Sequence, residues 1–291
     1  MSVQALEVIM VQQDSIDCKT KEDVQKNIDA SLAWIDRACR AYPETDLIVF
    51  PECGIQGGHP SPDADVPFKI PSAGMQPLMD KCKERQVWAL FNFLEAEDNR
   101  VYNTCALIND KGEIALKYRK VNPYVPVECN YPGDKFEVCE GPKGAVFGVM
   151  ICYDGDFPEV GRELAYMGAN VLLRPTSYMD PYSIPWEFTN RARAYENMAY
   201  VIACNRCGVG DLFYTFGSSM AVDFDGRILA QAPAGRECMA KVTIYPELVD
   251  QIRKERKTVN HLYNLKHRGY SAVGNDGLTD NPYKITYGGW K

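Results

Sequence analysis

The chain has 291 residues, 46% of them hydrophobic, and a formal net charge of −7, which suits one large folded domain. With a pI near 5.2 and no basic cluster, we expect no binding to nucleic acid or to an anionic membrane surface. Eleven cysteines scattered through apolar segments indicate reduced thiols in a soluble, cytoplasmic protein. Residues 1–10 read as a first strand and not as a signal peptide.

The first half of the chain alternates between strand and helix patterns. Residues 21–41 carry apolar side chains at helical spacing. Short apolar runs predict strands at residues 5–12, 47–50, 87–94, 101–108 and 114–118. The last two flank Asn109-Asp110-Lys111-Gly112, a strong hairpin turn. A hairpin makes its two strands antiparallel, so the sheet is predicted to be mixed.

The second half repeats this alternation. Strands are expected at residues 146–152, 171–174, 200–205, 217–222 and 227–231, and helices at residues 159–167 and 185–197. The last two strands are joined by Asp223-Phe224-Asp225-Gly226, with glycine where a positive φ is wanted. We therefore predict one layered α/β domain over residues 1–259. Residues 260–291 are polar and aperiodic, and are expected to form a tail that is either disordered or packed on a partner subunit.

Four polar residues follow predicted strands or lie in a stiff loop. Glu52, Lys120 and Cys152 each stand at a strand end, and Glu128 lies in the proline-rich loop VNPYVPVECNYPG. Functional groups of layered α/β proteins gather at the carboxyl ends of strands, where loops open onto a crevice. These four residues are therefore candidates for a single site.

Their chemistry is complementary. A cysteine acts as a nucleophile only as a thiolate or with a base that takes its proton. A buried glutamate can serve as that base. A lysine held between carboxylates can stabilise the oxyanion that forms when sulfur attacks a carbonyl or nitrile carbon. This chemistry needs no cofactor and no metal.

The junction after Cys152 favours acyl transfer. A strand would hold the thiol rigidly, and the backbone N–H of Tyr153 would point into the crevice as a second oxyanion donor. Gly155 lets the chain turn without a Cβ clash, and Pro158 suits the first turn of the next helix.

Four segments carry a resemblance to a known family. They are VFPE (residues 49–52), YRKVNPYVPVECNYPG (118–133), GVMICYDGDFPEVGRELAYMGANVLL (148–173) and NHLYNLKHRGY (260–270). Together they resemble the nitrilase superfamily, in its aliphatic amidase and formamidase branch, over about residues 5–270. The resemblance implies a four-layer αββα sandwich with mixed sheets and a homo-oligomer, either a dimer or a larger assembly.

The resemblance also implies roles for individual residues. Glu52 matches the family's general base, Lys120 its oxyanion-stabilising lysine and Cys152 its nucleophile. Glu128 matches a second glutamate, which is compatible with orienting Lys120.

The substrate pocket is expected to depart from the branch. Relatives carry tryptophans in the loop where this chain has Tyr124 and Cys129-Asn130, which predicts a roomier or more polar acyl pocket than formamide or acetamide requires. Thr176 and Tyr178 follow a strand where relatives place substrate-lining residues. His59 is expected at the pocket rim, because Glu52 already fills the role of base.

The predicted function is hydrolysis of a small-molecule amide, with release of ammonia through a cysteine thioester. Nitrile or N-carbamoyl hydrolysis is the alternative within the superfamily, and a non-catalytic oligomeric scaffold is the alternative of another class. The pair Cys204 and Cys207 has zinc-type spacing, but no second pair completes four ligands. Cys204 and Cys207 are therefore interpreted as buried strand residues.

Overall fold

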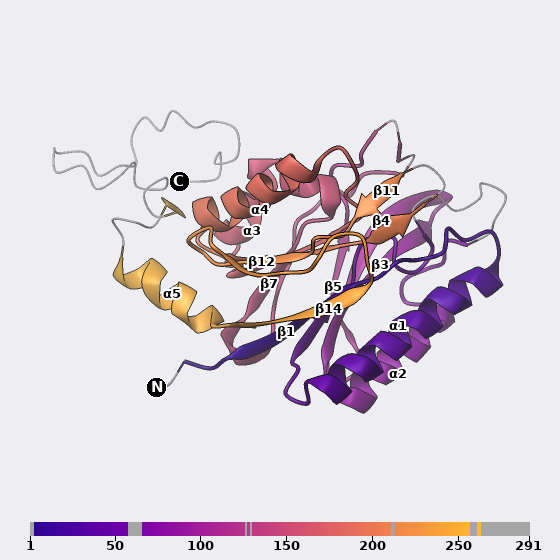
Figure 1. The fold of residues 1–291 in the computed structure, drawn as a ribbon, viewed down its shortest axis with the longest axis horizontal. Helices are drawn as coiled ribbons and strands as arrows, with labels where there is room; N and C mark the ends of the chain where they lie inside the picture. Colours follow the sequence, from indigo (N-terminus) through magenta and orange to yellow (C-terminus); the bar gives the residue numbers. More distant parts are fainter. Residues whose placement is uncertain are drawn as a thin grey trace.

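Two six-stranded mixed sheets form the centre of the computed structural model (Figure 1). In spatial order, the first sheet contains β14 (Cys238–Ile244), β1 (Leu6–Gln12), β2 (Leu47–Val49), β3 (Trp88–Glu97), β4 (Arg100–Ile108) and β5 (Ile114–Arg119). The second contains β13 (Ile228–Gln231), β12 (Met220–Val222), β9 (Tyr200–Asn205), β8 (Val171–Thr176), β7 (Val146–Val149) and β6 (Val138–Glu140). Strands β10 (Cys207–Val209) and β11 (Tyr214–Phe216) pair separately. The structure describes residues 3–57, 66–125, 127–128, 130–210, 213–256 and 261–262.

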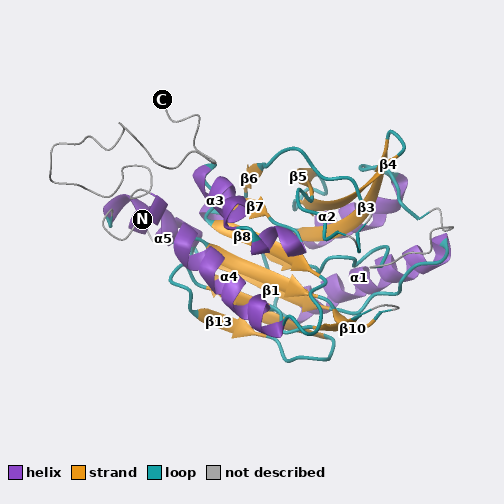
Figure 2. Ribbon diagram, turned by 90° about the horizontal axis from the view of Figure 1, so that it is seen from above, coloured by secondary structure: helices purple, strands orange, loops and turns teal. Residues whose placement is uncertain are grey.

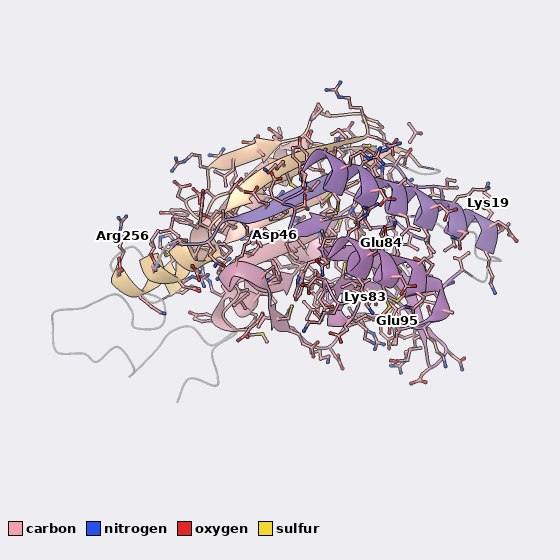
Figure 3. The ribbon with its side chains drawn as sticks, turned by 90° about the horizontal axis from the view of Figure 1, so that it is seen from below. Lys19, Asp46, Lys83, Glu84, Glu95 and Arg256 are labelled. Carbon is pink, nitrogen blue, oxygen red and sulfur yellow. The ribbon has the colours of Figure 1, made fainter. Side chains whose placement is uncertain are left out.

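Helices cover the outer face of each sheet (Figures 1 and 2). The α-helices are α1 (Lys21–Ala41) and α2 (Gln76–Arg85) over the first sheet, α3 (Pro158–Tyr166) and α4 (Ser183–Asn197) over the second, and α5 (Pro246–Glu255) after β14. Among the described residues, the short 3-10 helices are η1 (Ala73–Met75), η2 (Pro142–Gly144) and η3 (Cys152–Asp156). Lys83 and Glu84 of α2 lie at the solvent side of the α1–α2 layer (Figure 3). The predicted four-layer αββα sandwich is confirmed.

Strand β1 shows how the layers form. Side chains alternate between the two faces of a strand, and in β1 both faces are buried. Val8 and Met10 belong to the apolar cluster between the two sheets. Ile9 and Val11 belong to the cluster beneath α1 and α2. A strand that is buried on both faces reads as a continuous apolar run, as residues 8–11 of β1 do.

Helix α1 has the limits that its apolar spacing predicts. Thr20 caps its amino terminus, accepting a hydrogen bond from the Asp23 N–H while the Asp23 carboxylate accepts one from the Thr20 N–H. Val24, Ile28 and Ile35 form the buried stripe that packs on the first sheet. This packing against the sheet stabilises the helix beyond its own propensity.

The two predicted turns are confirmed. Gly112 and Gly226 have φ of +77° and +84°, as turns at these positions require. Strands β3, β8 and β12 differ from their predicted limits: β3 ends at Glu97, β8 ends at Thr176 and β12 begins at Met220. The strand expected over residues 146–152 ends at Val149, and Cys152 begins η3. The isolated apolar run could not reveal this, because a short 3-10 turn and a buried strand end have the same apolar character.

Several elements lie outside the predicted ones. They are α2, α5, β6, β10, β11 and β14. Helix α2 buries only Leu78 and Cys82, and Lys241 interrupts the apolar pattern of β14. Cys204 is a fully buried residue of β9, and its thiol donates to the backbone carbonyls of Val11 and Val49, as the buried-strand interpretation expects.

Two predictions fall on parts of the chain outside the described residues. His59 is one, and the tail over residues 260–291 is the other, except for His261 and Leu262. The His261 ring contacts the Tyr195 ring of α4, with centroids 4.5 Å apart. Within the described ranges, no helix is both long and apolar enough to span a bilayer.

Candidate active site

The candidate residues meet where strands of both sheets end. Strand β5 points the same way as β2, because β2 is parallel to β3 and the β3–β4–β5 ladder reverses direction twice. Glu52 follows β2 and Lys120 follows β5, so both lie at the same end of the first sheet. Ser177 follows β8 of the second sheet, and its N–H donates to Glu52 Oε2 at 2.9 Å. This bond joins the two sheets at the site.

Lys120 is a buried cation between two carboxylates. Its side chain is 1% exposed, and Nζ lies 2.9 Å from Glu52 Oε1 and 2.8 Å from Glu128 Oε2. Burial alone would lower the pKa of Lys120, but Glu52 and Glu128 outweigh burial and hold this pKa well above its ordinary value. Burial would likewise raise the pKa of Glu128, yet the Lys120 charge and hydrogen bonds leave it lowered. The ammonium therefore stays charged.

Two asparagines hold the carboxylates in place. Asn103 Nδ2 donates to Glu52 Oε1 at 2.8 Å and to Glu128 Oε1 at 2.9 Å. Asn92 Nδ2 donates in turn to Asn103 Oδ1 at 2.6 Å, and Asn92 Oδ1 accepts from the Cys53 N–H at 2.8 Å. Both asparagines are almost fully buried. Neither was a sequence candidate, although a polar amide inside each of two apolar strand patterns was a usable signal.

Cys152 occupies a conformation that is rare outside glycine. Its φ is +48°, a left-handed backbone that costs about 1–3 kcal/mol and persists where surrounding contacts enforce it. Those contacts come from Arg174, whose Nε and Nη2 donate to the Cys152 carbonyl at 3.0 and 2.8 Å. Burial, and then the Glu52 charge, raise the pKa of the Cys152 thiol well above its ordinary value. The thiol is therefore protonated until a base takes its proton.

The turn after Cys152 is tied to the Lys120 segment. Asp154 is fully buried. Its Oδ2 accepts from Tyr118 at 2.8 Å and its Oδ1 from the Asn122 N–H at 2.9 Å. Tyr118 and Asn122 flank Lys120 in sequence, so Asp154 fixes Lys120 relative to Cys152. This tie between the two sheets was not predicted.

Gly155 is required for a reason other than the predicted one. A Cβ at this position would lie 2.0 Å from Arg174 Nε. The close passage of the Arg174 side chain excludes a larger residue, whereas the left-handed turn falls on Cys152. Pro158 begins α3, as expected.

Two cavities adjoin the thiol. A small one, of about 50 Å³, is lined by Glu52, Lys120, Glu128 and Cys152, together with Cys53, Tyr124, Val127, Ser177, Met179, Arg206, Gly210, Phe213 and Thr215. A larger one, of about 270 Å³, is lined by Tyr124, Cys152, Tyr153, Asp156, Tyr178, Met179 and Tyr182. Both cavities share Tyr124, Cys152 and Met179. The four candidate catalytic residues therefore face one space, with a second space beside it.

The secondary candidates divide between the cavities and the interior. Tyr124, Tyr153 and Tyr178 line the larger cavity. Thr176 does not, which corrects the prediction: it is fully buried and its hydroxyl donates to Asn205 Oδ1 at 2.8 Å. The strand β8 continues through Thr176, so its side chain points into the sandwich and the next residue, Ser177, reaches the site.

The family profile of carbon-nitrogen hydrolases matches residues 8–254. The chain belongs to the carbon-nitrogen hydrolase family. Formamidases of Bacillus cereus (strain B4264) and Bacillus anthracis are each 38% identical to it over 270 residues, which cover 91% of this chain and 81% of the relative. The predicted resemblance to the nitrilase superfamily is thereby confirmed.

Solved structures agree with this assignment. Nit3 of Saccharomyces cerevisiae, a member of branch 10 of the nitrilase superfamily, has a TM-score of 0.76 and 27% identity over 86% of this chain and 94% of that chain. A mutant of the amidase from Nesterenkonia sp. AN1, with acrylamide added at the active-site cysteine, has a TM-score of 0.73 and 23% identity over 86% of this chain and 98% of that chain. This carbon-nitrogen hydrolase therefore has the fold of enzymes that act on carbon–nitrogen bonds other than peptide bonds.

Proposed function

We propose that this carbon-nitrogen hydrolase is an amidase that forms a thioester on Cys152. Glu52 takes the thiol proton, and sulfur attacks the amide carbon. The oxyanion is held by Lys120 and by the N–H of Tyr153. Glu128 keeps Lys120 charged and in position. The observation that carries this proposal is the buried Lys120 ammonium, bonded to Glu52 and Glu128 at the wall of the cavity that the Cys152 thiol lines.

Glu52 accepts and returns the protons that move during the reaction. The carboxylate accepts the thiol proton as the C–S bond forms, and returns it to the leaving nitrogen as the C–N bond breaks, so ammonia departs. Water then attacks the thioester, with Glu52 again taking a proton and the thiol receiving it back. The amide and one water yield a carboxylic acid and ammonia. Because burial keeps the thiol protonated, the nucleophile depends on this base.

The larger cavity is proposed as the acyl site. The carbonyl oxygen must lie near Lys120 and the leaving nitrogen near Glu52, and both residues line the small cavity. The remaining substituent, the acyl chain, must then point away from them. The cavity of about 270 Å³ adjoins Cys152 but has neither Lys120 nor Glu52 in its wall. It has room for acyl groups well beyond formyl or acetyl.

Substitution of the nucleophile tests this proposal. Purified protein is expected to release ammonia from short amides, and Cys152→Ala to release none while keeping its circular dichroism spectrum. Cys139→Ala, which removes a half-buried thiol elsewhere, should retain activity. Intact mass after brief exposure to substrate and acid quench should show an acyl adduct on the wild type. Full activity of Cys152→Ala would overturn the proposal, and a protein with no activity and no adduct would be the scaffold alternative.

A panel of substrates tests the bond that is cleaved. We expect the highest kcat/KM for primary amides, ahead of nitriles and ureido compounds with the same substituent. A nitrile or ureido compound with the higher kcat/KM would instead identify the alternative hydrolase of the same family.

We also propose that the chain forms a homo-oligomer through α4. Ile184, Phe188 and Tyr195 are 77%, 58% and 54% exposed, and their spacing puts them on one face of the helix. A groove of about 450 Å³ beside Ile184 and Phe188 is also lined by Phe216. A second copy of the chain, packed across a two-fold axis, would bury this stripe against its own copy. The tail beginning at His261, which contacts Tyr195, would extend this interface.

Light scattering tests the interface. The wild type should be dimeric or larger, and Phe188→Glu should shift it toward monomer, because a buried unpaired charge opposes association. Ile16→Glu, at an exposed position before α1, should leave the mass unchanged. A monomeric wild type would contradict the proposal.

A cytoplasmic location is proposed as well. The described cysteines are free thiols, as expected for a protein that works in a reducing compartment. Fractionation of cells that express the chain should recover it with cytoplasmic markers.

A further inference from the structure

The larger cavity has a charged side chain in an aromatic wall. Its described lining consists of the tyrosines Tyr124, Tyr153, Tyr178 and Tyr182 with Cys152, Met179 and Asp156. Asp156 is the one charged residue among them. Asp156 is the counter-ion of the buried Arg174, and it is also the charged group that the cavity exposes to a ligand. An alkyl chain would leave the open side of this carboxylate without a partner, whereas a cationic group would supply one.

The contacts of Asp156 leave part of its carboxylate open to the cavity. Arg174 Nη2 donates to Oδ1 at 2.7 Å, and the Tyr178 hydroxyl lies 3.0 Å from Oδ1 and 2.9 Å from Oδ2. A carboxylate has about four acceptor positions, so acceptor capacity remains. The Asp156 side chain is 26% exposed, whereas Arg174 is fully buried behind it. A ligand in the cavity therefore meets the anion and not the guanidinium.

The tyrosine rings suit a cation. Aromatic faces within about 6 Å attract ammonium and guanidinium groups, and the attraction strengthens where water is excluded. The Tyr178 ring already has the Arg174 guanidinium 5.4 Å from its centroid. The rings of Tyr124, Tyr153 and Tyr182 carry no such contact in the described structure. The formal charge of −7 also draws cationic molecules toward the protein.

We infer that the acyl site takes a chain that ends in an ammonium or similar cation, bound by Asp156 among Tyr124, Tyr153 and Tyr182. This inference rests on the proposed amidase function. Asp156 ends the same 3-10 helix that Cys152 begins, which separates their Cα atoms by about 8 Å along the axis at about 2 Å per residue. The cation must therefore lie several bonds from the amide carbon. The substrate class is ω-amino amides, and α-amino amides are too short.

Matched pairs of amides test the inference on the wild-type protein. 6-Aminohexanamide and heptanamide differ only in an ammonium in place of a methyl group, and 4-aminobutanamide and pentanamide form a shorter pair. We expect kcat/KM for 6-aminohexanamide to exceed that for heptanamide by about ten-fold or more, the effect of about 1.4 kcal/mol of cation binding. A heptanamide preference, or equal values for each pair, overturns the inference while leaving the amidase proposal intact.

Two substitutions test which side chains cause the preference for 6-aminohexanamide over heptanamide. Asp156→Asn keeps the side-chain size but removes the charge, so the ratio of the two kcat/KM values should fall toward one, whatever the absolute rates become. Tyr182→Leu should lower the same ratio by removing one ring. Tyr245→Phe, an exposed tyrosine outside the cavity lining, should leave the ratio unchanged. A ratio in Asp156→Asn equal to that of the wild type contradicts the role of Asp156.

Binding without turnover separates this inference from the proposed function. Calorimetry on Cys152→Ala, which cannot form a thioester, should show 6-aminohexanamide binding about ten-fold or more tighter than heptanamide. This holds even if the wild type hydrolyses neither amide, because the amidase proposal is decided by ammonia release from short amides and by the acyl adduct on Cys152. Equal affinities, or tighter binding of heptanamide, would end the cation inference alone.

Discussion

Lys120 sets the electrostatics of the site. A buried ammonium without partners would lose its proton, because desolvation disfavours the charged form. Here Glu52 and Glu128 more than offset burial. The arrangement leaves one net negative charge on three groups, shared over bonds of 2.8–2.9 Å. A cation that remains charged in a water-poor site is the property that an oxyanion donor needs.

Glu128→Gln is expected to weaken the electrostatic stabilisation of the Lys120 ammonium. One carboxylate that raises the pKa of Lys120 is lost while burial, which lowers it, remains. The pKa of Lys120 should therefore fall, and the alkaline limb of the kcat/KM profile should move to lower pH. At neutral pH, kcat should fall by up to roughly 10²–10³, as for an impaired oxyanion donor. Glu137→Gln, on an exposed side chain, is the control. An alkaline limb at its wild-type position would count against this account.

Asn103 is expected to act through the carboxylates it holds. Asn103→Leu removes both hydrogen bonds to Glu52 and Glu128 and the bond that Asn92 Nδ2 donates to Asn103 Oδ1. We expect kcat to fall by roughly 10- to 100-fold, as when other supporting hydrogen bonds are lost, with little change in KM. Thr104→Val is the matched control, because Thr104 is equally buried in β4 and bonds Glu95 instead. Equal losses of kcat in both variants would indicate a purely structural role for Asn103.

At the scale of elements, η3 determines how Cys152, the proposed nucleophile, is presented. Strand β7 ends at Val149, and the chain tightens into η3 at Cys152. Arg174 reaches across from β8 to bond the Cys152 carbonyl, and it also donates to Thr189 and Asn190 of α4. One guanidinium thus links η3, β8 and α4. This link supports the strained φ of Cys152, together with the local hydrogen bonds between Ile151 and Asp154.

Gly155→Ala should break that link. The added Cβ would overlap Arg174 Nε at 2.0 Å, so Arg174 must move away from the Cys152 carbonyl. We expect a loss of about 1–3 kcal/mol in the free energy of unfolding, as for other overpacked sites, together with a lower kcat. Gly74→Ala is the control, since its Cβ would have no neighbour closer than 3.7 Å. Urea unfolding and steady-state kinetics of both variants measure these effects. Wild-type values for Gly155→Ala would contradict the argument.

At the scale of the whole molecule, buried thiols couple stability to alkaline pH. Burial raises the pKa of Cys18, Cys82 and Cys207 from 9.0 to about 12. In the unfolded chain these thiols ionise near pH 9, while in the folded chain they stay protonated. Their contribution is therefore fully present below about pH 9 and is lost progressively as pH rises toward 12.

The free energy of unfolding should accordingly fall between about pH 9 and pH 11. Each fully buried thiol contributes a slope of at most about 1.4 kcal/mol per pH unit. Cys82→Ala, at a fully buried position, should be less stable at neutral pH and should show a shallower alkaline slope. Urea unfolding across this range measures both slopes. Parallel slopes in the two proteins would exclude Cys82 as a contributor.

The sequence predicts more of the fold than of the residues that hold the candidate site in place. The limits of α1 followed from its apolar spacing, and the β4–β5 hairpin followed from its turn residues, because both signals are local. Glu52, Lys120, Glu128 and Cys152 were named from strand ends and family motifs, and the structure brings them to one cavity. Helix α2 was missed because a short helix with two buried side chains leaves almost no periodicity.

The sequence by itself therefore determined the alternating α/β elements and the family, and it supplied the candidates for the reacting residues. Only the tertiary structure decided which groups hold and surround them. Asn103 and Asp154 act across strands and sheets, and Ser177 bonds Glu52 from 125 positions away. Periodicity reports the neighbours of a residue within its own element. Partners in another sheet depend on how the layers pack, and that packing is a property of the folded chain as a whole.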